Sequence, residues 1–389
     1  MYKIKTLNNI SQAGLDLLPP NTYEVSSDLS DPHGIILRSF NMHDMEVPES
    51  LLAVSRAGAG VNNIPVEQYT EKGIVVFNTP GANANAVKEL VLAAILMSSR
   101  KIVEGIEWAK TLKGKGESVP SLVEKGKSTF AGPEIKRKRF GVIGLGAIGA
   151  MVANHAHSLG MEVSGYDPFI SVQSAWRLSR GIQRATDLDS LLAESDYISI
   201  HIPLLDKTKE FINKETISKM KEGVRLFNFS RGELVNDDDI IEAVNNGLVH
   251  KYITDFPTDK LLGVDNIITI PHLGASTPES EDNCALMAAD ELKNYLESGN
   301  IRNSVNYPEC ELPASIESAQ RITIAHKNVP NMVGQIASCL ALDHINISNM
   351  INKSKTHYAY TIIDVEKNIS DITIEHLSKI PGVIRVRSI

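Results

Sequence analysis

The sequence predicts an α/β protein built on parallel sheets, followed by a smaller antiparallel unit. Short apolar runs alternate with helix-period segments along most of the chain, which is typical of a doubly wound parallel sheet. A glycine pattern, Gly144-x-Gly146-x-x-Gly149, stands between one such run and a helix start. Residues 319–389 follow the order strand, helix, strand, strand, helix, strand, which is that of ferredoxin-like domains.

The first segment is predicted to be a small α/β unit of flavodoxin-like type, without a glycine fingerprint of its own. Its expected strands are short, apolar and bounded by polar or glycine-rich turns, as in buried parallel sheets. They span residues 1–6, 34–38, 51–56 and 73–78. From Asn85 to Trp108 the apolar residues recur at helical spacing, so one long helix leads out of this unit.

The glycine pattern predicts a dinucleotide site in a Rossmann-type sheet. A helix N-terminus offers free N–H groups and the positive end of a dipole to a pyrophosphate. Gly144 allows the turn, Gly146 lets the backbone approach the phosphate, and Gly149 lets the helix pack on the strand. Asp167 ends the next strand, about 20 residues later, where an acid binds the ribose. A carboxylate repels a 2′-phosphate and so favours NAD, although Arg177 and Arg180 downstream leave NADP open.

The later strands end in polar side chains. His201, Arg231, Asp255 and His272 each follow an apolar run. The carboxyl ends of strands in a doubly wound sheet face the cofactor and the substrate, so these side chains are expected to meet in one crevice. A helix near residues 281–296 is expected to return to the first unit, which makes that unit discontinuous.

The predicted domain organisation has four parts. They are a substrate-binding domain (1–90 and 284–305), a dinucleotide-binding domain (91–283), a linker (306–318) and the C-terminal unit (319–389).

The residues at the crevice suit hydride transfer between a hydroxy acid and a nicotinamide. A guanidinium such as Arg231 can grip a carboxylate and polarise a carbonyl. An imidazole such as His272 can exchange the hydroxyl proton. A neighbouring carboxylate would hold the imidazole and stabilise its charged form. Asp255 and Asp259 both lie before His272, and we assign Asp259 to this role.

The composition narrows the function classes. A net charge of −8 argues against nucleic-acid binding. The three cysteines (Cys284, Cys310 and Cys339) are odd in number and lack metal-ligand spacing, so we expect no metal site and a reducing compartment. No apolar run reaches bilayer length, and the first residues resemble no signal segment. We therefore predict a cytoplasmic protein that binds neither membranes nor nucleic acids.

Several motifs together resemble the D-2-hydroxyacid dehydrogenases, most closely the branch that oxidises phosphoglycerate. These motifs are Arg56-Ala-Gly58-Ala-Gly60-Val, Asn78-Thr-Pro-Gly81, Val142–Gly149, Ser230-Arg231-Gly232 and Pro271–Ser280. The resemblance covers essentially the whole chain. It implies a hinged two-domain enzyme, assembled as a homodimer or homotetramer, in which Arg231, an acid and His272 are catalytic.

The resemblance also implies a substrate site and a regulatory tail. Backbone N–H groups of Gly58, Ala59 and Gly60 would hold the substrate carboxylate. Arg38 and Arg56 match arginines that bind the anionic groups of 3-phosphoglycerate. The tail is similar to an ACT domain, and three of its residues match positions that bind L-serine between two subunits. These are His326, Asn328 and Asn346.

Two departures from the family pattern stand out. The family acid is usually a glutamate followed by a longer loop, whereas this chain has Asp259. The Asp of the preceding strand end could match Asp255 or be displaced to Thr254. The tail has Pro330-Asn331 in place of Pro-Gly, and asparagine tolerates the positive φ that such a turn requires.

We predict NAD-dependent oxidation of 3-phospho-D-glycerate to 3-phosphohydroxypyruvate, the first step of L-serine synthesis. The predicted cofactor contacts are Gly144, Gly146, Ala147, Ile148, Gly149, Asp167, His201, Pro203, Asp255 and Gly274. One alternative is another 2-hydroxyacid dehydrogenase, acting on glyoxylate, hydroxypyruvate or lactate. A second is an NAD-sensing interaction protein without catalysis. The tail could also be only an assembly scaffold.

Overall fold

The computed structural model of the chain describes residues 1–313 and 318–389. Part of the predicted linker, residues 314–317, lies outside the described residues. No helix in the described ranges is long and apolar enough to cross a membrane.

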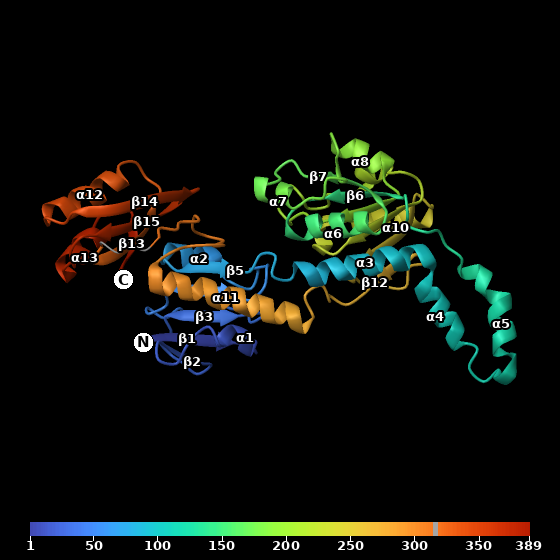
Figure 1. Cartoon of the computed structure of the whole chain (residues 1–389), viewed down its shortest axis with the longest axis horizontal. Coiled ribbons are helices and arrows are strands. Elements are labelled where there is room, and N and C mark those ends of the chain that lie inside the picture. The colour runs from blue at the N-terminus through green and yellow to red at the C-terminus, as the bar shows by residue number, and fades with distance from the viewer. Residues whose placement is uncertain (314–317) are drawn as a thin grey trace. The chain divides into compact units, whose positions relative to one another are not determined.

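The described chain forms two compact units (Figure 1). The first unit comprises residues 1–83 and 278–389, and the second comprises residues 84–277. The chain thus leaves the first unit once and returns once. The predicted domain changes, at 90/91 and 283/284, lie several residues after these two crossings.

The first unit contains a five-stranded parallel sheet of order β2-β1-β3-β4-β5, which is the flavodoxin-like order. Its strands are β1 (Tyr2–Leu7), β2 (Tyr23–Ser26), β3 (Gly34–Leu37), β4 (Ala53–Arg56) and β5 (Val75–Asn78). The four strands predicted here are confirmed. Strand β2 was not predicted, because its residues Tyr-Glu-Val-Ser do not form an apolar run.

Three helices flank this sheet, namely α1 (Gln12–Leu15), α2 (Val66–Glu71) and α11 (Pro278–Ser298). The predicted return of the 281–296 helix to the first unit is confirmed, because α11 packs on β3, β4 and β5. It buries residues at helical spacing, among them Ala285, Ala288, Leu292 and Tyr295. A Cβ on Gly14 of α1 would lie 2.4 Å from the carbonyl oxygen of Ala285, so the crossing of α1 and α11 requires glycine.

The second unit contains a seven-stranded parallel sheet of order β12-β11-β10-β9-β6-β7-β8. Its strands are β6 (Arg139–Ile143), β7 (Glu162–Tyr166), β8 (Gln183–Arg184), β9 (Tyr197–Ile200), β10 (Val224–Asn228), β11 (Val249–Thr254) and β12 (Ile267–Thr269). The strand order reverses between β6 and β9. Ligands of doubly wound sheets bind at such a reversal, outside the carboxyl ends of the strands.

The second unit also contains helices, several of which contact its strands. They are α3 (Ala84–Arg100), α4 (Ile102–Lys110), α5 (Val119–Gly126), α6 (Ala147–Ser158), α7 (Val172–Trp176), α8 (Leu188–Glu194), α9 (Lys214–Ser218) and α10 (Asp237–Asn245). The prediction of one helix from Asn85 to Trp108 was wrong. Lys101 has φ 43°, and this left-handed residue separates α3 from α4.

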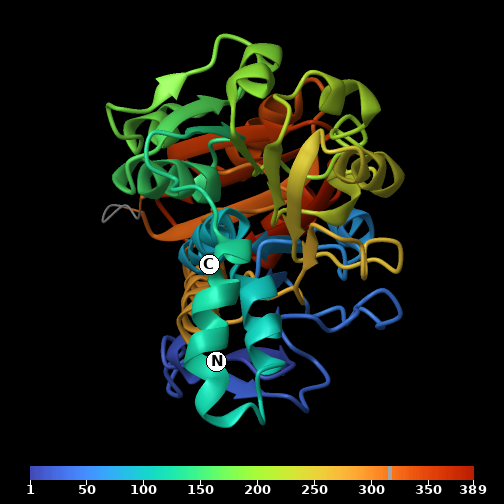
Figure 2. The ribbon, with the colours of Figure 1, turned by 90° about the vertical axis from the view of Figure 1, so that its right-hand side faces the viewer.

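Helices α4 and α5 form an arm that extends away from the body of the second unit (Figures 1 and 2). Neither helix buries a residue. The rings of Trp108 and Phe130 pack against each other at a tilt, with ring centroids 5.2 Å apart. Ile102, Ile106 and Val123 leave apolar surface exposed. The lysine- and glycine-rich segment of residues 112–138 includes α5 and is thus partly helical.

The C-terminal residues form an antiparallel sheet of order β14-β15-β13-β16, covered by two helices. The elements are β13 (Gln320–Lys327), α12 (Met332–Leu342), β14 (Ile347–Lys355), β15 (Tyr358–Val365), α13 (Asp371–Ser378) and β16 (Val383–Ser388). The predicted order of strands and helices is confirmed. We call this part the tail.

The start of α12 corrects one detail of the tail. The sequence of residues 329–342 predicts a helix with Pro330 in its first turn, but α12 begins at Met332. Asn331 precedes it with φ 63°, a left-handed conformation that only a few residue types adopt readily. The prediction that asparagine would keep the turn is confirmed.

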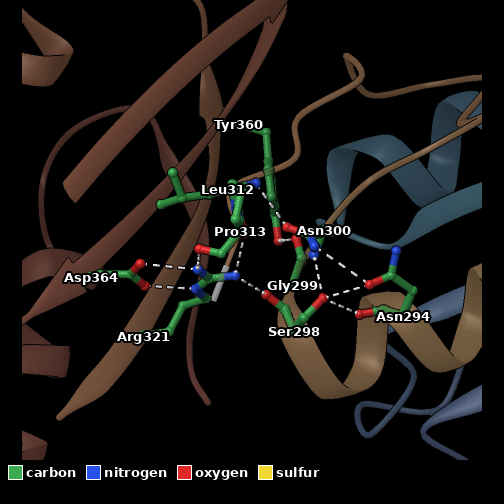
Figure 3. A network of polar contacts seen from close by, with 9 residues as sticks. All are labelled: Asn294, Ser298, Gly299, Asn300, Leu312, Pro313, Arg321, Tyr360 and Asp364. Atoms are coloured by element: carbon green, nitrogen blue, oxygen red, sulfur yellow. Dashed lines mark hydrogen bonds and ion pairs between the residues drawn. The ribbon is translucent and has the colours of Figure 1, made fainter. Parts of the chain in front are cut away.

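Side chains of the tail cap the C-terminal end of α11 within the first unit (Figure 3). The Arg387 guanidinium donates to the carbonyl of Leu296 at 3.1 Å and lies 4.6 Å above the centroid of the Tyr295 ring. The Tyr360 hydroxyl donates to the carbonyl of Gly299 at 2.9 Å. The last carbonyls of a helix lack intrahelical donors and carry the negative end of its dipole. The guanidinium and hydroxyl groups of the tail supply the missing hydrogen-bond donors, and the guanidinium also supplies a positive charge.

Candidate active site and substrate-binding loops

The glycine turn of the second unit leaves its backbone open to a ligand. Gly144 has φ 90°, and a Cβ there would lie 2.5 Å from the carbonyl oxygen of His201. A Cβ on Gly149 would lie 1.9 Å from the carbonyl oxygen of Gly144. Nothing lies within 4 Å of a Cβ built on Gly146. Gly146 precedes α6, and no side chain caps the first N–H groups of this helix. The turn therefore presents backbone donors and open space to a phosphate.

Asp167 lies directly against this turn. Its Oδ2 accepts a hydrogen bond from the N–H of Leu145 at 2.8 Å, and its Oδ1 accepts one from the N–H of Phe169 at 2.8 Å. These two bonds fix the carboxylate while its remaining lone pairs stay free for ribose hydroxyls. The open turn, the uncapped helix and this carboxylate fit the pyrophosphate and ribose of NAD.

The other predicted cofactor contacts lie at the same edge of the sheet or close to it. Ala147 and Ile148 form the first turn of α6, and Pro203 follows β9. The His201 ring is neutral at pH 7, because burial lowers its pKa to about 3. Its Nε2 lies 2.8 Å from the Ser199 hydroxyl.

The turn after β10 places Arg231. The buried Asn228 donates to the carbonyl of Arg231 at 2.8 Å and accepts from the N–H of Ser230 at 3.2 Å. The Ser230 hydroxyl donates to the carbonyl of Ile200 on β9 at 2.7 Å. The Arg231 side chain itself is exposed. Asn228 was not predicted as a site residue, although a lone amide inside the apolar run Leu-Phe-Asn-Phe is a detectable signal.

A buried carboxylate interacts electrostatically with the predicted acid–base group. Asp255 is 1% exposed, and neither of its carboxylate oxygens has a hydrogen-bond partner among the described residues. Burial raises the pKa of Asp255, and the charges of His272 and Arg231 act in the opposite direction. The structure thus brings these three groups into one electrostatic cluster. Gly274, also predicted here, is buried, and a Cβ on it would lie 3.4 Å from Oδ2 of Asp255.

Asp259 is placed differently from the other predicted catalytic residues. It lies exposed on the loop after β11, and within residues 1–313 and 318–389 no hydrogen bond or ion pair joins it to His272. The imidazole of His272 is exposed and packs on Phe256, with ring centroids 4.8 Å apart. Phe256 supports the ring from one side and was not singled out from the sequence.

The predicted substrate loop of the first unit follows β3 and β4. Arg56 donates through Nε to the carbonyl of Arg38 at 2.9 Å and through Nη1 to the carbonyl of Gly60. The amide of Asn78 donates to the carbonyl of Ala59 at 2.5 Å. In this structure Arg56 therefore organises the loop that contains Gly58, Ala59 and Gly60.

The turn that contains Arg38 is held by an asparagine that the sequence analysis missed. Asn8 Oδ1 accepts from the N–H groups of Arg38, Ser39 and Phe40, at 3.2, 3.1 and 2.8 Å. Asn63 donates to the carbonyl of Arg38 at 3.1 Å. The Arg38 side chain thus projects from a turn fixed on both its N–H and its carbonyl side, and its Nη1 lies 2.8 Å from Oε1 of Glu281.

A single copy of the tail does not bring its three predicted effector residues together. His326 is buried, and its ring nitrogens lie 2.8 Å from the carbonyl oxygen of Lys327 and 2.9 Å from the hydroxyl of Thr361. Asn328 follows β13, at the same end of the sheet as His326. Asn346 precedes β14, at the opposite end by strand register, and donates to Glu366 at 2.7 Å.

Comparison with known proteins defines the class. The family of the D-isomer specific 2-hydroxyacid dehydrogenase, NAD binding domain, matches residues 92–274. Its span contains the glycine turn, Asp167, Arg231 and His272. The second unit is accordingly the NAD-binding part of a D-isomer specific 2-hydroxyacid dehydrogenase, and NAD is its cofactor.

Similarity to named relatives covers more of the chain. This chain is 30% identical over 378 residues to the D-3-phosphoglycerate dehydrogenase of Haemophilus influenzae, and the match covers 94% of this chain and 88% of the relative. It is 34% identical over 358 residues to that of Archaeoglobus fulgidus, of whose length it spans 64%. An NAD⁺-bound 3-phosphoglycerate dehydrogenase of Entamoeba histolytica is similar at a TM-score of 0.62 and 26% identity, covering 78% of this chain and 98% of that one. The chain belongs to the D-3-phosphoglycerate dehydrogenases.

Proposed function

We propose that the protein oxidises 3-phospho-D-glycerate to 3-phosphohydroxypyruvate with NAD, as the first step of L-serine biosynthesis. The observation that carries this proposal is the cluster of Arg231, Asp255 and His272 at the sheet edge that also holds the glycine turn. A guanidinium, an imidazole and a carboxylate are what hydride removal from a hydroxy acid requires. The names of relatives that cover 94% of the chain support the same substrate.

Each residue of the cluster has a distinct proposed role. NAD, held by the glycine turn and Asp167, would supply the acceptor for the hydride that leaves C2 of the substrate. The exposed fork of Arg231 binds the substrate carboxylate and the C2 oxygen, where negative charge is greatest. The imidazole of His272, which packs on Phe256, accepts the hydroxyl proton. A carboxylate stabilises the imidazolium that results. Asp255 is favoured for this by its electrostatic interaction with His272, while Asp259 remains the prediction from sequence.

The first unit supplies the proposed anion contacts of the substrate. Backbone N–H groups of Gly58, Ala59 and Gly60 would bind the carboxylate, and the Arg38 guanidinium would bind the phosphate. The fixed turn around Arg38 supports this, because a guanidinium on a rigid backbone loses less entropy on binding.

We also propose that the tail is an ACT domain that senses L-serine in a dimer or larger assembly of the chain. His326 and Asn346 lie at opposite ends of the sheet, so a site that uses both requires a second copy. The exposed apolar residues of the α4–α5 arm offer a surface for a further contact between copies. If the tail is only a scaffold, millimolar L-serine leaves the initial rate unchanged.

A spectrophotometric assay of NADH formation tests the activity. We expect turnover of 3-phosphoglycerate, and little turnover of plain hydroxy acids such as lactate or glycolate. Faster NADH consumption with glyoxylate or hydroxypyruvate would instead indicate the substrate preference of other 2-hydroxyacid dehydrogenases. NAD binding without turnover of any acid would indicate an NAD-sensing protein.

A further inference from the structure

An ion pair in the first unit occupies the arginine that is proposed to bind the substrate phosphate. Nη1 of Arg38 lies 2.8 Å from Oε1 of Glu281. The two side chains are 35% and 45% exposed, so neither charge is locked in the interior. Arg38 follows β3, and Glu281 lies in the first turn of α11. The contact therefore joins two elements far apart in the sequence.

Only the side chains need to move for this pair to separate. Asn8 and Asn63 hold the backbone of the Arg38 turn, and Glu281 belongs to a regular helix. The first turn of a helix stabilises a carboxylate through its free N–H groups and the helix dipole. Glu281 therefore keeps a favourable position after it loses Arg38. Exposed ion pairs contribute little to stability, so the separation costs little.

A phosphate monoester is a stronger partner for Arg38 than a glutamate. It carries nearly two negative charges and can accept two parallel hydrogen bonds from one guanidinium. Anions of lower charge gain less from the same exchange. An incoming anion must therefore bind Arg38 more strongly than the carboxylate does in order to displace it.

We propose that Glu281 is an internal competitor for the phosphate group of the substrate. Glu281 neutralises Arg38 while the site is empty, and the substrate phosphate displaces it. This inference rests on the proposed function, because it assigns the Arg38 end of the site to a phosphate monoester. Its consequence is that the site excludes stray anions at the cost of some affinity for the substrate.

Glu281→Gln tests the exchange through kinetics, with Glu279→Gln as a matched control. Glu279 lies in the same first turn, is exposed and forms no ion pair among the described residues. We expect Glu281→Gln to lower KM for 3-phosphoglycerate about two- to fivefold at low ionic strength, which corresponds to the free energy of an exposed ion pair. The gain falls on KM rather than on kcat, and it disappears in an Arg38→Ala background. Glu279→Gln is expected to change KM by much less.

Inorganic phosphate gives a readout that does not depend on turnover. We expect Glu281→Gln to bind inorganic phosphate more tightly than the wild type does, measured by calorimetry or by the shift of the thermal unfolding midpoint. Its affinity is also expected to fall more steeply with ionic strength, because binding then creates an ion pair instead of exchanging one. The two measurements test different proposals. A wild-type protein that does not oxidise 3-phosphoglycerate refutes the proposed function, whereas the phosphate titration tests the exchange at Arg38 without turnover.

Three results overturn the exchange. A Glu281→Gln variant with equal or weaker phosphate binding shows that the glutamate positions Arg38 or does nothing there. An effect of Glu281→Gln that persists with Arg38→Ala places the cause elsewhere. An equal effect of Glu279→Gln attributes it to the general field of the helix end.

Discussion

Two buried aspartates show how differently the molecule treats the same side chain. Asp364 of the tail and Asp255 of the NAD-binding unit are each 1% exposed. Both oxygens of Asp364 accept hydrogen bonds from Arg321, at 2.6 and 2.9 Å. Neither oxygen of Asp255 has a hydrogen-bond partner among the described residues. A charge that is fully paired holds structure together, whereas a charge left unpaired at a sheet edge is available for a ligand or for a neighbouring catalytic group.

The surroundings of Arg321 make the contrast complete. Besides the pair with Asp364, its guanidinium donates to the carbonyls of Ser298, Leu312 and Pro313, at 3.0, 2.9 and 3.0 Å (Figure 3). All five N–H donors of an arginine can be satisfied by these contacts. Arg321 thereby joins the tail sheet to the end of α11 and to the segment before the tail.

The largest predicted effect is the loss of this joint. Arg321→Ala leaves Asp364 buried without its partner, and breaking a buried pair in this way costs about 3–5 kcal/mol. We expect the free energy of unfolding in urea to fall by that amount. Replacing both partners, as in Arg321→Met with Asp364→Leu, is expected to recover only part of the loss, because the carbonyls of Ser298, Leu312 and Pro313 still lose their donor. A single variant with nearly wild-type stability would contradict the distinction drawn between the two aspartates.

Glu291 is a buried carboxyl with one paired and one unpaired oxygen, and it gives the next largest predicted effect on stability. It is buried on α11, and Oε1 accepts from Asn303 at 2.8 Å while Oε2 has no partner among the described residues. Burial raises its pKa from 4.5 to about 8. The folded state then holds a proton that the unfolded chain has lost, so stability decreases as pH rises from 4.5 to about 8 and this loss is absent below 4.5.

The Glu291→Gln variant isolates this dependence. We expect the unfolding free energy of the wild type to fall by roughly 1–4 kcal/mol more than that of the variant between pH 5 and pH 8, measured in urea. The exposed Glu279→Gln serves as the control and is expected to follow the wild type. Parallel pH curves for wild type and Glu291→Gln would show that this carboxyl has an ordinary pKa.

The same comparison explains what could be predicted from the sequence. The glycine turn, Asp167 and the strand ends that carry Arg231 and His272 follow from local patterns, because backbone geometry there depends on residues close in the chain. Partners such as Asn8 or Asp364 act across long sequence separations, and a lone polar residue carries no sign of its partner. For that reason the sequence gives no ground to prefer Asp255 over Asp259, the residue predicted, since both precede His272 and only the fold buries one of them.

The smallest predicted effects separate those two aspartates. Asp255→Asn keeps the shape of the side chain and removes a buried, unpaired charge, so stability is expected to stay equal or to rise by about 1 kcal/mol. If Asp255 stabilises the charged form of His272, kcat for 3-phosphoglycerate is expected to fall about tenfold or more at pH 7, since one pKa unit of lost interaction equals a factor of ten.

Asp259→Asn is the paired measurement. Because Asp259 is exposed, and no hydrogen bond or ion pair joins it to His272 among the described residues, we expect kcat to change by less than about threefold, in line with the weakness of exposed charge interactions. NAD affinity, followed by fluorescence quenching, shows whether Asp255→Asn acts through the cofactor instead of through His272. A reversed order, with Asp259→Asn the slower enzyme, would assign the carboxylate as the sequence predicted and would mean that the loop after β11 moves during turnover.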